Sequence, residues 1–240
     1  MANDKIKITS VSELLDESDK HSSRDWIYRG VTDQRFKLLP SIGHTRHYSV
    51  KQTISESEEE QALWRFKDNV RSHIGHTVEN DLEWMVIAQH HGLPTRLLDW
   101  TRRPLVAAYF AATTIQNRIT LSPTRRINTP IDGAIYAVKR PPKVGLEDRE
   151  KPFQVDRVKF IDPPHISERV PRQVSVLTIH PTPAEPWNPS DMIKFLIPKQ
   201  YKFDIKKELD RLGINEAALF PGVDATARYI GWQLKWDRLP

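Results

Sequence analysis

The chain has 240 residues, of which 38% are hydrophobic and 28% charged, a composition typical of a globular protein long enough to bury a core. It contains no cysteine, which excludes disulfides, thiolate metal sites, iron–sulfur clusters and cysteine nucleophiles. Its 36 Lys and Arg residues outnumber its 31 Asp and Glu residues, a small excess that favours a phosphate-bearing partner only weakly.

The sequence predicts a soluble, cytoplasmic protein. Its first residues lack the basic and then apolar pattern of a signal peptide, and no apolar run approaches the roughly 20 residues that span a bilayer. No internal repeat is visible, so we expect a single domain.

The first half of the chain predicts mainly helices. A capping-box pattern at Ser10 begins a short helix, and the aromatic and branched residues at 25–30 predict a strand. Apolar residues recur at three- and four-residue steps over 55–74, as in an amphipathic helix, and a second helix is expected over 80–91.

The middle and the second half of the chain predict most of the strands. A buried strand at 95–100 precedes a helix that begins at Pro104 and is apolar nearly all round, which predicts a central helix. Because helices come early and strands late, the sequence favours an α+β fold, with a helix-rich N-terminal half packed on a mixed or antiparallel sheet. Later strands are expected at 133–138, 157–161, 174–179 and 193–197, followed by a helix at 204–212, a short segment at 214–220 and a helix at 224–235.

The most informative segment is AQHHGLPTRLLDWTRRPLVAAYFAA, at 88–112. It places a helix end, a tight turn, a strand and the start of another helix within one short span. The first N–H groups of a helix are unpaired and its dipole favours anions, so a phosphate or pyrophosphate site is expected here. The polar and aromatic residues brought together are Gln89, His90, His91, Arg96, Asp99, Trp100 and Thr101.

These residues resemble the FRG domain family. Tyr28-Arg29-Gly30 corresponds to the Phe-Arg-Gly motif of the family, with tyrosine in place of phenylalanine. The resemblance covers about 25–230, so we expect one FRG domain in 1–240 with its core in that range. It implies a bacterial or phage-defence setting. Further matching pieces are Pro40-Ser41, 88–101, 104–111, Gln173 and Leu219-Phe220-Pro221, whereas Ser175 stands where glycine is usual.

A looser resemblance links the chain to the ADP-ribosyltransferase superfamily. The shared order is an early strand with arginine, a strand that ends in a hydroxyl residue before a helix reading Ala-x-Tyr-Phe-Ala, and a late strand with glutamate. The resemblance implies an ADP-ribosyltransferase-like fold, NAD as substrate and no metal. It also implies that Arg29 holds NAD, Thr101 orients the nicotinamide ribose, and Glu216 contacts the ribose and the acceptor.

These residue types suit that chemistry. Breaking the nicotinamide–ribose bond builds positive charge on the ribose, which a carboxylate stabilises, while a guanidinium grips pyrophosphate through two hydrogen bonds. Because Asn215 directly precedes Glu216, the identity of the late catalytic residue stays open. Asp99 is the alternative carboxylate for the same role. The expected NAD-binding residues are Tyr28, Arg29, Gly30, Gln89, His90, Arg96, Asp99, Trp100 and Tyr109.

Each catalytic residue also has a structural interpretation. Arg29 and Asp99 then form ion pairs with neighbouring charges at strand ends, Thr101 caps a helix, and Glu216 is a solvated surface residue. The histidines lack an accompanying carboxylate or cysteine pattern, so no metal site is expected.

Three functions remain open. The favoured one is NAD-dependent transfer of ADP-ribose to a nucleic-acid base of DNA or RNA, as a toxin or defence effector. Basic residues at 118–126 and 235–238 are candidate contacts to a nucleic-acid backbone. The alternatives are a non-catalytic module that binds nucleotide or nucleic-acid phosphate, and a metal-independent nuclease that uses His90 or His91 with Asp99.

Overall fold

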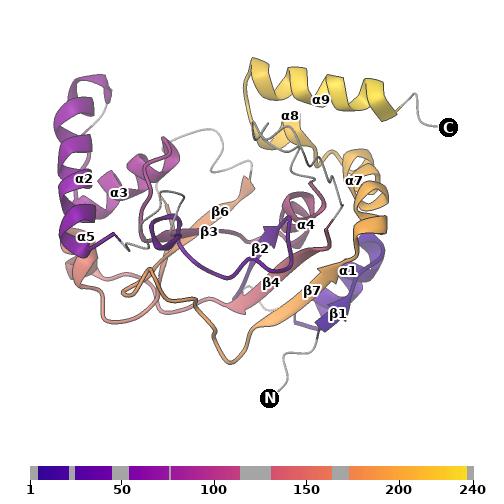
Figure 1. Ribbon diagram of the computed structural model, residues 1–240, viewed down its shortest axis with the longest axis horizontal. Helices are drawn as coiled ribbons and strands as arrows, with labels where there is room; N and C mark the ends of the chain where they lie inside the picture. The colour runs from indigo at the N-terminus through magenta and orange to yellow at the C-terminus, as the bar shows by residue number, and fades with distance from the viewer. Residues whose placement is uncertain are drawn as a thin grey trace, which may run out of the picture.

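The computed structural model describes residues 5–21, 25–44, 54–75, 77–113, 131–163 and 173–236 (Figure 1). The basic segment at 118–126 and residues 237–238 lie outside them. The strands are β1 (Lys5–Lys7), β2 (Trp26–Val31), β3 (Leu97–Thr101), β4 (Gly133–Lys139), β5 (Lys159–Ile161), β6 (Ser175–Ile179) and β7 (Ile193–Ile197). The helices are α1 (Val11–Asp19), α2 (Glu56–Val70), α3 (Asp81–His90), α4 (Pro104–Ala112), α5 (Leu146–Glu150), α7 (Lys202–Arg211), α8 (Glu216–Leu219) and α9 (Val223–Trp236). Short 3₁₀ turns occupy Ser41–Gly43, Arg71–His73, Pro152–Gln154 and Lys199–Tyr201.

In the described residues, seven strands form one sheet in the order β1-β7-β4-β2-β3-β6-β5. Neighbouring strands pair antiparallel, except that β1 and β7 are parallel. Helices cover this sheet, so the predicted α+β class is confirmed. No helix in these residues is long and apolar enough to cross a membrane.

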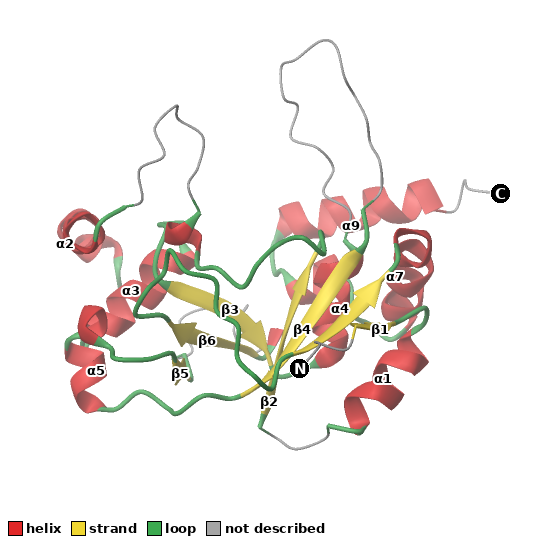
Figure 2. Cartoon of the chain, turned by 60° about the horizontal axis from the view of Figure 1, so that its bottom comes forward, coloured by secondary structure: helices red, strands yellow, loops and turns green. Residues whose placement is uncertain are grey.

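The sheet consists of two groups of strands that meet at one residue pair. β1, β7, β4 and β2 form the first group, and β3, β6 and β5 form the second. β2 joins β3 only through Tyr28 opposite Thr101, whereas β2 and β4 align along the whole length of β2. Figure 2 shows the two groups diverging from this junction. The sheet is therefore split between β2 and β3.

Helix α4 packs directly on the first group of strands, as the apolar sequence predicted. Small residues allow this close approach, because Ala107, Ala108 and Ala111 have no measurable exposure. A Cβ atom on Gly30 in β2 would lie 1.8 Å from the carbonyl oxygen of Ala107. Glycine in the Arg-Gly motif therefore has a packing role: it lets the helix backbone rest on the strand.

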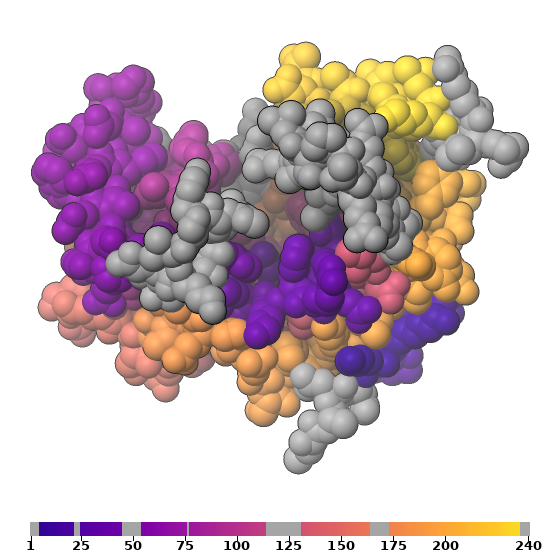
Figure 3. Space-filling model, in the orientation of Figure 1, coloured from indigo at the N-terminus to yellow at the C-terminus, as the bar shows by residue number. Residues whose placement is uncertain are grey.

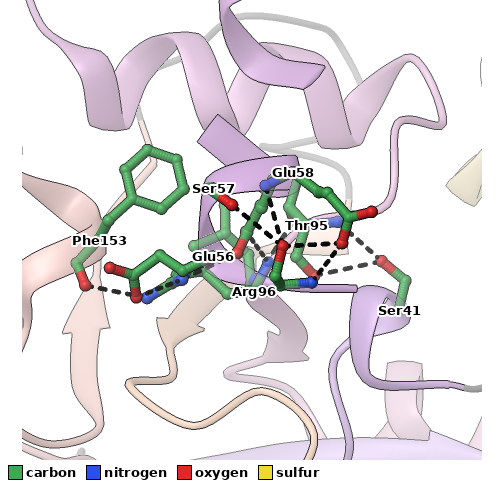
Figure 4. Close-up of polar contacts among 10 residues, drawn as sticks. Ser41, Glu56, Ser57, Glu58, Thr95, Arg96 and Phe153 are labelled. Atoms are coloured by element: carbon green, nitrogen blue, oxygen red, sulfur yellow. Dashed lines mark hydrogen bonds and ion pairs between the residues drawn. The ribbon is translucent and has the colours of Figure 1, made fainter. Parts of the chain in front are cut away.

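Arg96 attaches α2 to the second group of strands (Figure 4). Its side chain is 1% exposed, and its Nε donates to Glu59 Oε2 at 2.9 Å. The Arg96 backbone N–H donates to Glu59 Oε1 at 2.9 Å, and the guanidinium also reaches Glu56 and the carbonyl oxygen of Phe153. Both buried charges are thus paired and hydrogen-bonded, the condition under which burial is tolerated.

The late part of the chain differs from the sequence prediction at one important point. Glu216 does not lie on a strand, because residues 216–219 form the short helix α8. Asn215 caps this helix, its Oδ1 accepting the N–H of Ala218 at 3.0 Å. The prediction that Glu216 lies on a late strand is therefore wrong. Part of the looser resemblance to ADP-ribosyltransferases depended on that strand.

Candidate functional site

A pocket of about 440 Å³ lies at the split between the two groups of strands. It is bordered by β2, β3 and β6, by α3 and α4, and by the residue that follows α8. Its volume is within the range of small-molecule sites. Residues expected from the sequence that line it are Tyr28, Arg29, Gly30, Gln89, His90, Asp99, Trp100 and Thr101. Further lining residues are Val86, Phe110, Pro163, Gln173, Ser175, Leu177 and Phe220.

Arg29 reaches across the split and is half-buried. Its NH1 group donates to the backbone carbonyl oxygen of Asp99 at 2.7 Å. Asp25, the residue before β2, pairs with Arg140 at 3.1 Å. Within the described part of the chain, the Arg29 guanidinium forms no ion pair and no other hydrogen bond. Burial lowers the pKa of Arg29, but a guanidinium stays charged in proteins, so a cation with unused donors borders the pocket.

Asp99 is the one carboxylate among the described lining residues, and Gln89 orients it. Gln89 Nε2 donates to Asp99 Oδ1 at 2.8 Å, and the hydroxyl of Thr95 donates to Gln89 Oε1. Thr95 is itself fixed, because its backbone N–H donates to Ser41 Oγ at 3.1 Å. This chain of hydrogen bonds directs the amide N–H of Gln89 at the carboxylate.

Thr101 has a structural role in this geometry. Its hydroxyl donates to the carbonyl oxygen of Gln173 at 2.7 Å and accepts the backbone N–H of Arg103 at 3.1 Å. The side chain is buried at the junction of β3 with the start of α4. The hydroxyl is therefore occupied, but Thr101 does not cap α4, because Arg103 is the N-cap residue and the helix has no side-chain cap. Thr101 instead joins the turn before α4 to the segment before β6.

Phe110 and Phe220 supply an aromatic wall to the pocket. Their rings meet edge to face with centroids 5.9 Å apart. The residue before Phe220 is tied to the β6 side of the pocket, because Gln173 Nε2 donates to the carbonyl oxygen of Leu219 at 3.0 Å. A flat heterocycle can pack against such rings. Because α4 is apolar on every side, its sequence pattern does not show which of its faces borders the pocket.

Three residues expected in the site lie elsewhere. Arg96 is buried beneath α2, and Tyr109 and Glu216 face a small separate cleft among α4, α7, α8 and α9. The Glu216 carboxylate accepts a hydrogen bond from Nε of Arg228 in α9. Burial beside Glu216 raises the pKa of Tyr109 to about 12. The structure thus brings Asp99 next to Arg29 and leaves Glu216 outside the pocket.

His180 is buried near Arg29, at the end of β6. The indole N–H of Trp100 donates to Thr178 Oγ1 at 3.0 Å, and that hydroxyl is hydrogen-bonded to His180 Nε2 at 2.8 Å. Burial and the positive charge of Arg29 lower the pKa of His180 to about 4. The imidazole is therefore neutral at physiological pH and adds no charge beside the pocket.

This burial makes stability depend on pH. Between pH 6.5 and about 4 the unfolded chain binds a proton at His180 and the folded chain does not, so the free energy of unfolding falls as pH falls. The pKa difference corresponds to about 3 kcal/mol. As pH falls from 6.5 to about 4, we expect the free energy of unfolding, measured in urea, to decrease less for His180→Gln than for the wild type. Parallel losses in the two proteins would contradict the prediction.

The described residues form an α+β protein with one sheet, and the candidate site is the pocket where that sheet splits. Residues 24–118 match the family model of the FRG domain. This match supports the resemblance to the FRG family over that part of the chain. Comparison with curated proteins and with solved structures finds no significant match. The matched segment contains β2, β3, α3 and α4, which supply Arg29, Gln89, Asp99 and Phe110.

Proposed function

We propose that this pocket binds NAD and that the protein transfers ADP-ribose from it, with a nucleic-acid base as the favoured acceptor. The observation that carries the proposal is the Arg29 guanidinium, half-buried at the pocket with no ion-pair partner among the described residues. A partly desolvated cation without a direct ion pair favours an anionic ligand, and the paired oxygens of a pyrophosphate match the geometry of a guanidinium.

The rest of the pocket complements the other parts of NAD. Phe110 and Phe220 offer ring edges and faces for a base or for nicotinamide. Asp99 offers a carboxylate whose orientation Gln89 fixes. The split between β2 and β3 supports an ADP-ribosyltransferase-like arrangement, since it lets one ligand touch Arg29 from the first group of strands and Asp99 from the second.

In the proposed reaction, nicotinamide leaves with the electron pair of its bond to ribose, and positive charge develops on the sugar. A carboxylate placed near that carbon lowers the energy of the transition state, a role for which Asp99 is the available group. The acceptor nitrogen or oxygen forms the new bond at the same carbon and releases its proton, which His90 at the pocket can accept.

We expect Arg29→Ala to weaken NAD binding about 10- to 100-fold, because hydrogen bonds to a charged group contribute about 1.5–3 kcal/mol. Arg29→Lys should bind with intermediate affinity, because it keeps the charge and loses the planar fork. Isothermal titration calorimetry measures both. Arg140→Ala is the matched control, since it removes an exposed arginine that pairs with Asp25 outside the pocket. Unchanged NAD affinity in Arg29→Ala would remove the proposed site.

The acceptor is tested separately from NAD binding. Arg103 is exposed close to the pocket residue Thr101, and its positive charge supports a nucleic-acid backbone as the partner. The neighbouring Arg102 is exposed as well but pairs with Asp162 at 3.0 Å. Wild-type protein is incubated with NAD and single-stranded DNA, RNA or a protein mixture, and nicotinamide release and the mass of the acceptor are measured. Modified DNA or RNA supports the proposal. Saturable NAD binding without nicotinamide release would instead indicate a non-catalytic binding module.

A further inference from the structure

Helix α9 carries an apolar stripe on the side that faces away from the rest of the protein. Figure 3 shows this helix at the surface along one edge of the molecule. Spacings of four, three and four residues place the members of the stripe on one helical face. They are Val223, Ala227, Ile230 and Leu234, all exposed, with Val223 at 84%, Ile230 at 50% and Leu234 at 57%.

The opposite face of α9 anchors the helix. Ala225 is buried, and Tyr229 donates its hydroxyl to Asp210 Oδ1 in α7 at 2.8 Å. The ammonium group of Lys206, also in α7, lies 4.7 Å from the centre of the Trp232 ring. These contacts account for the aromatic residues of α9. Among the described residues they leave the apolar stripe exposed, and its four aligned members distinguish it from scattered surface hydrophobic residues.

We propose that the stripe binds the same stripe of a second copy of this chain, with the two α9 helices antiparallel. The stripe is symmetrical, because Ala227 and Ile230 have the same midpoint as Val223 and Leu234. In an antiparallel pair, Ala227 then lies opposite the partner's Ile230, and Val223 lies opposite the partner's Leu234. A small residue meets a large one at the centre, so the two helices can approach closely, and the contact closes on itself as a twofold interface requires.

Charge complementarity supports the same arrangement. Asp224 and Lys235 are three helical turns apart and lie on the same flank of the stripe. Neither forms an ion pair within the described part of the chain. Antiparallel helices bring equal flanks together, so Asp224 would lie beside the partner's Lys235, and the pair would occur twice. A partner of one charge sign would match only one end of this helix.

The size of the contact sets the expected affinity. Helix α9 has 14 residues and is about 21 Å long. Two helices of this length bury less area than the roughly 1,200–2,000 Å² of stable interfaces. We therefore expect a reversible dimer with a dissociation constant in the micromolar range.

Sedimentation velocity at about 1–200 µM protein tests the proposal. The wild type should pass from monomer to dimer, and Ile230→Glu should raise the dissociation constant at least about 10-fold, because it places a charge opposite an apolar residue twice. Leu146→Glu in α5 is the control, since Leu146 is 83% exposed and lies outside the stripe. Circular dichroism confirms that these exposed substitutions leave the fold intact.

A charge exchange tests the antiparallel orientation. Asp224→Lys alone and Lys235→Asp alone should each weaken the dimer, whereas an equimolar mixture of the two variants should form a heterodimer with restored ion pairs. A wild type that stays monomeric at every concentration overturns the proposal. So does a dimer that resists Ile230→Glu, or a mixture that associates no better than either variant. Binding of a monomeric wild type to lipid vesicles would assign the stripe to a membrane surface instead.

Discussion

Asp99→Asn is expected to slow nicotinamide release from NAD by about 100- to 1,000-fold, whereas Glu216→Gln is expected to leave the rate within about twofold of the wild type. The reason is position. Asp99 is held at the pocket by Gln89 and lies beside Arg29, while the Glu216 carboxylate is bound to Arg228 in a separate cleft. The substitution removes a negative charge and leaves the shape of the side chain almost unchanged.

Single-turnover measurements at saturating NAD separate this effect from weaker binding. A loss in the rate constant with unchanged NAD affinity places the Asp99 charge in the chemical step. Gln89→Leu should produce part of the same loss, because the carboxylate would no longer be oriented. If Glu216→Gln abolishes the reaction and Asp99→Asn does not, the assignment of the carboxylate is reversed and α8 must reach the substrate in the working complex.

Gly30→Ala is expected to destabilise the protein by more than about 3 kcal/mol or to prevent folding. The added Cβ would lie 1.8 Å from the carbonyl oxygen and 2.8 Å from the carbonyl carbon of Ala107. Both are backbone atoms of α4, so no side-chain rotation can relieve the overlap. The helix would have to move off β2, and the contacts of its buried alanines would be lost with it.

Urea unfolding measures this loss, and Gly75→Ala provides the matched control. A Cβ at Gly75 would meet nothing within 4 Å, so this second alanine should change the free energy of unfolding by less than about 1 kcal/mol. If Gly30→Ala were as stable as Gly75→Ala, the tight contact between β2 and α4 would be incorrect.

The sequence predicted the central elements because their signals are local. Pro104 at the first turn and the apolar residues after it specified α4, and the Asn80 cap specified the start of α3. Gln89 and Asp99 were expected near each other because the connection between α3 and β3 is short, and both line the pocket. These predictions succeeded because the residues that determine each feature lie close together along the chain.

Long-range pairing explains what the sequence did not reveal. The partner of Arg96 is Glu59, 37 residues away in a helix rich in glutamate, and no pattern marks one glutamate among its neighbours as the buried one. The helix that contains Glu216 has four residues and shows too little periodicity for recognition, although Asn215 is a good cap in retrospect.

The junction between β2 and β3 has a mechanical consequence. A continuous ladder makes a sheet twist as one body, but here Tyr28 opposite Thr101 is the single ladder pair between the two groups in the described residues. Rotation of one group against the other would disturb few backbone hydrogen bonds, so we expect the width of the pocket to change more easily than in a continuous sheet. A ligand that touches both Arg29 and Asp99 would act as a brace between the two halves and stiffen the sheet.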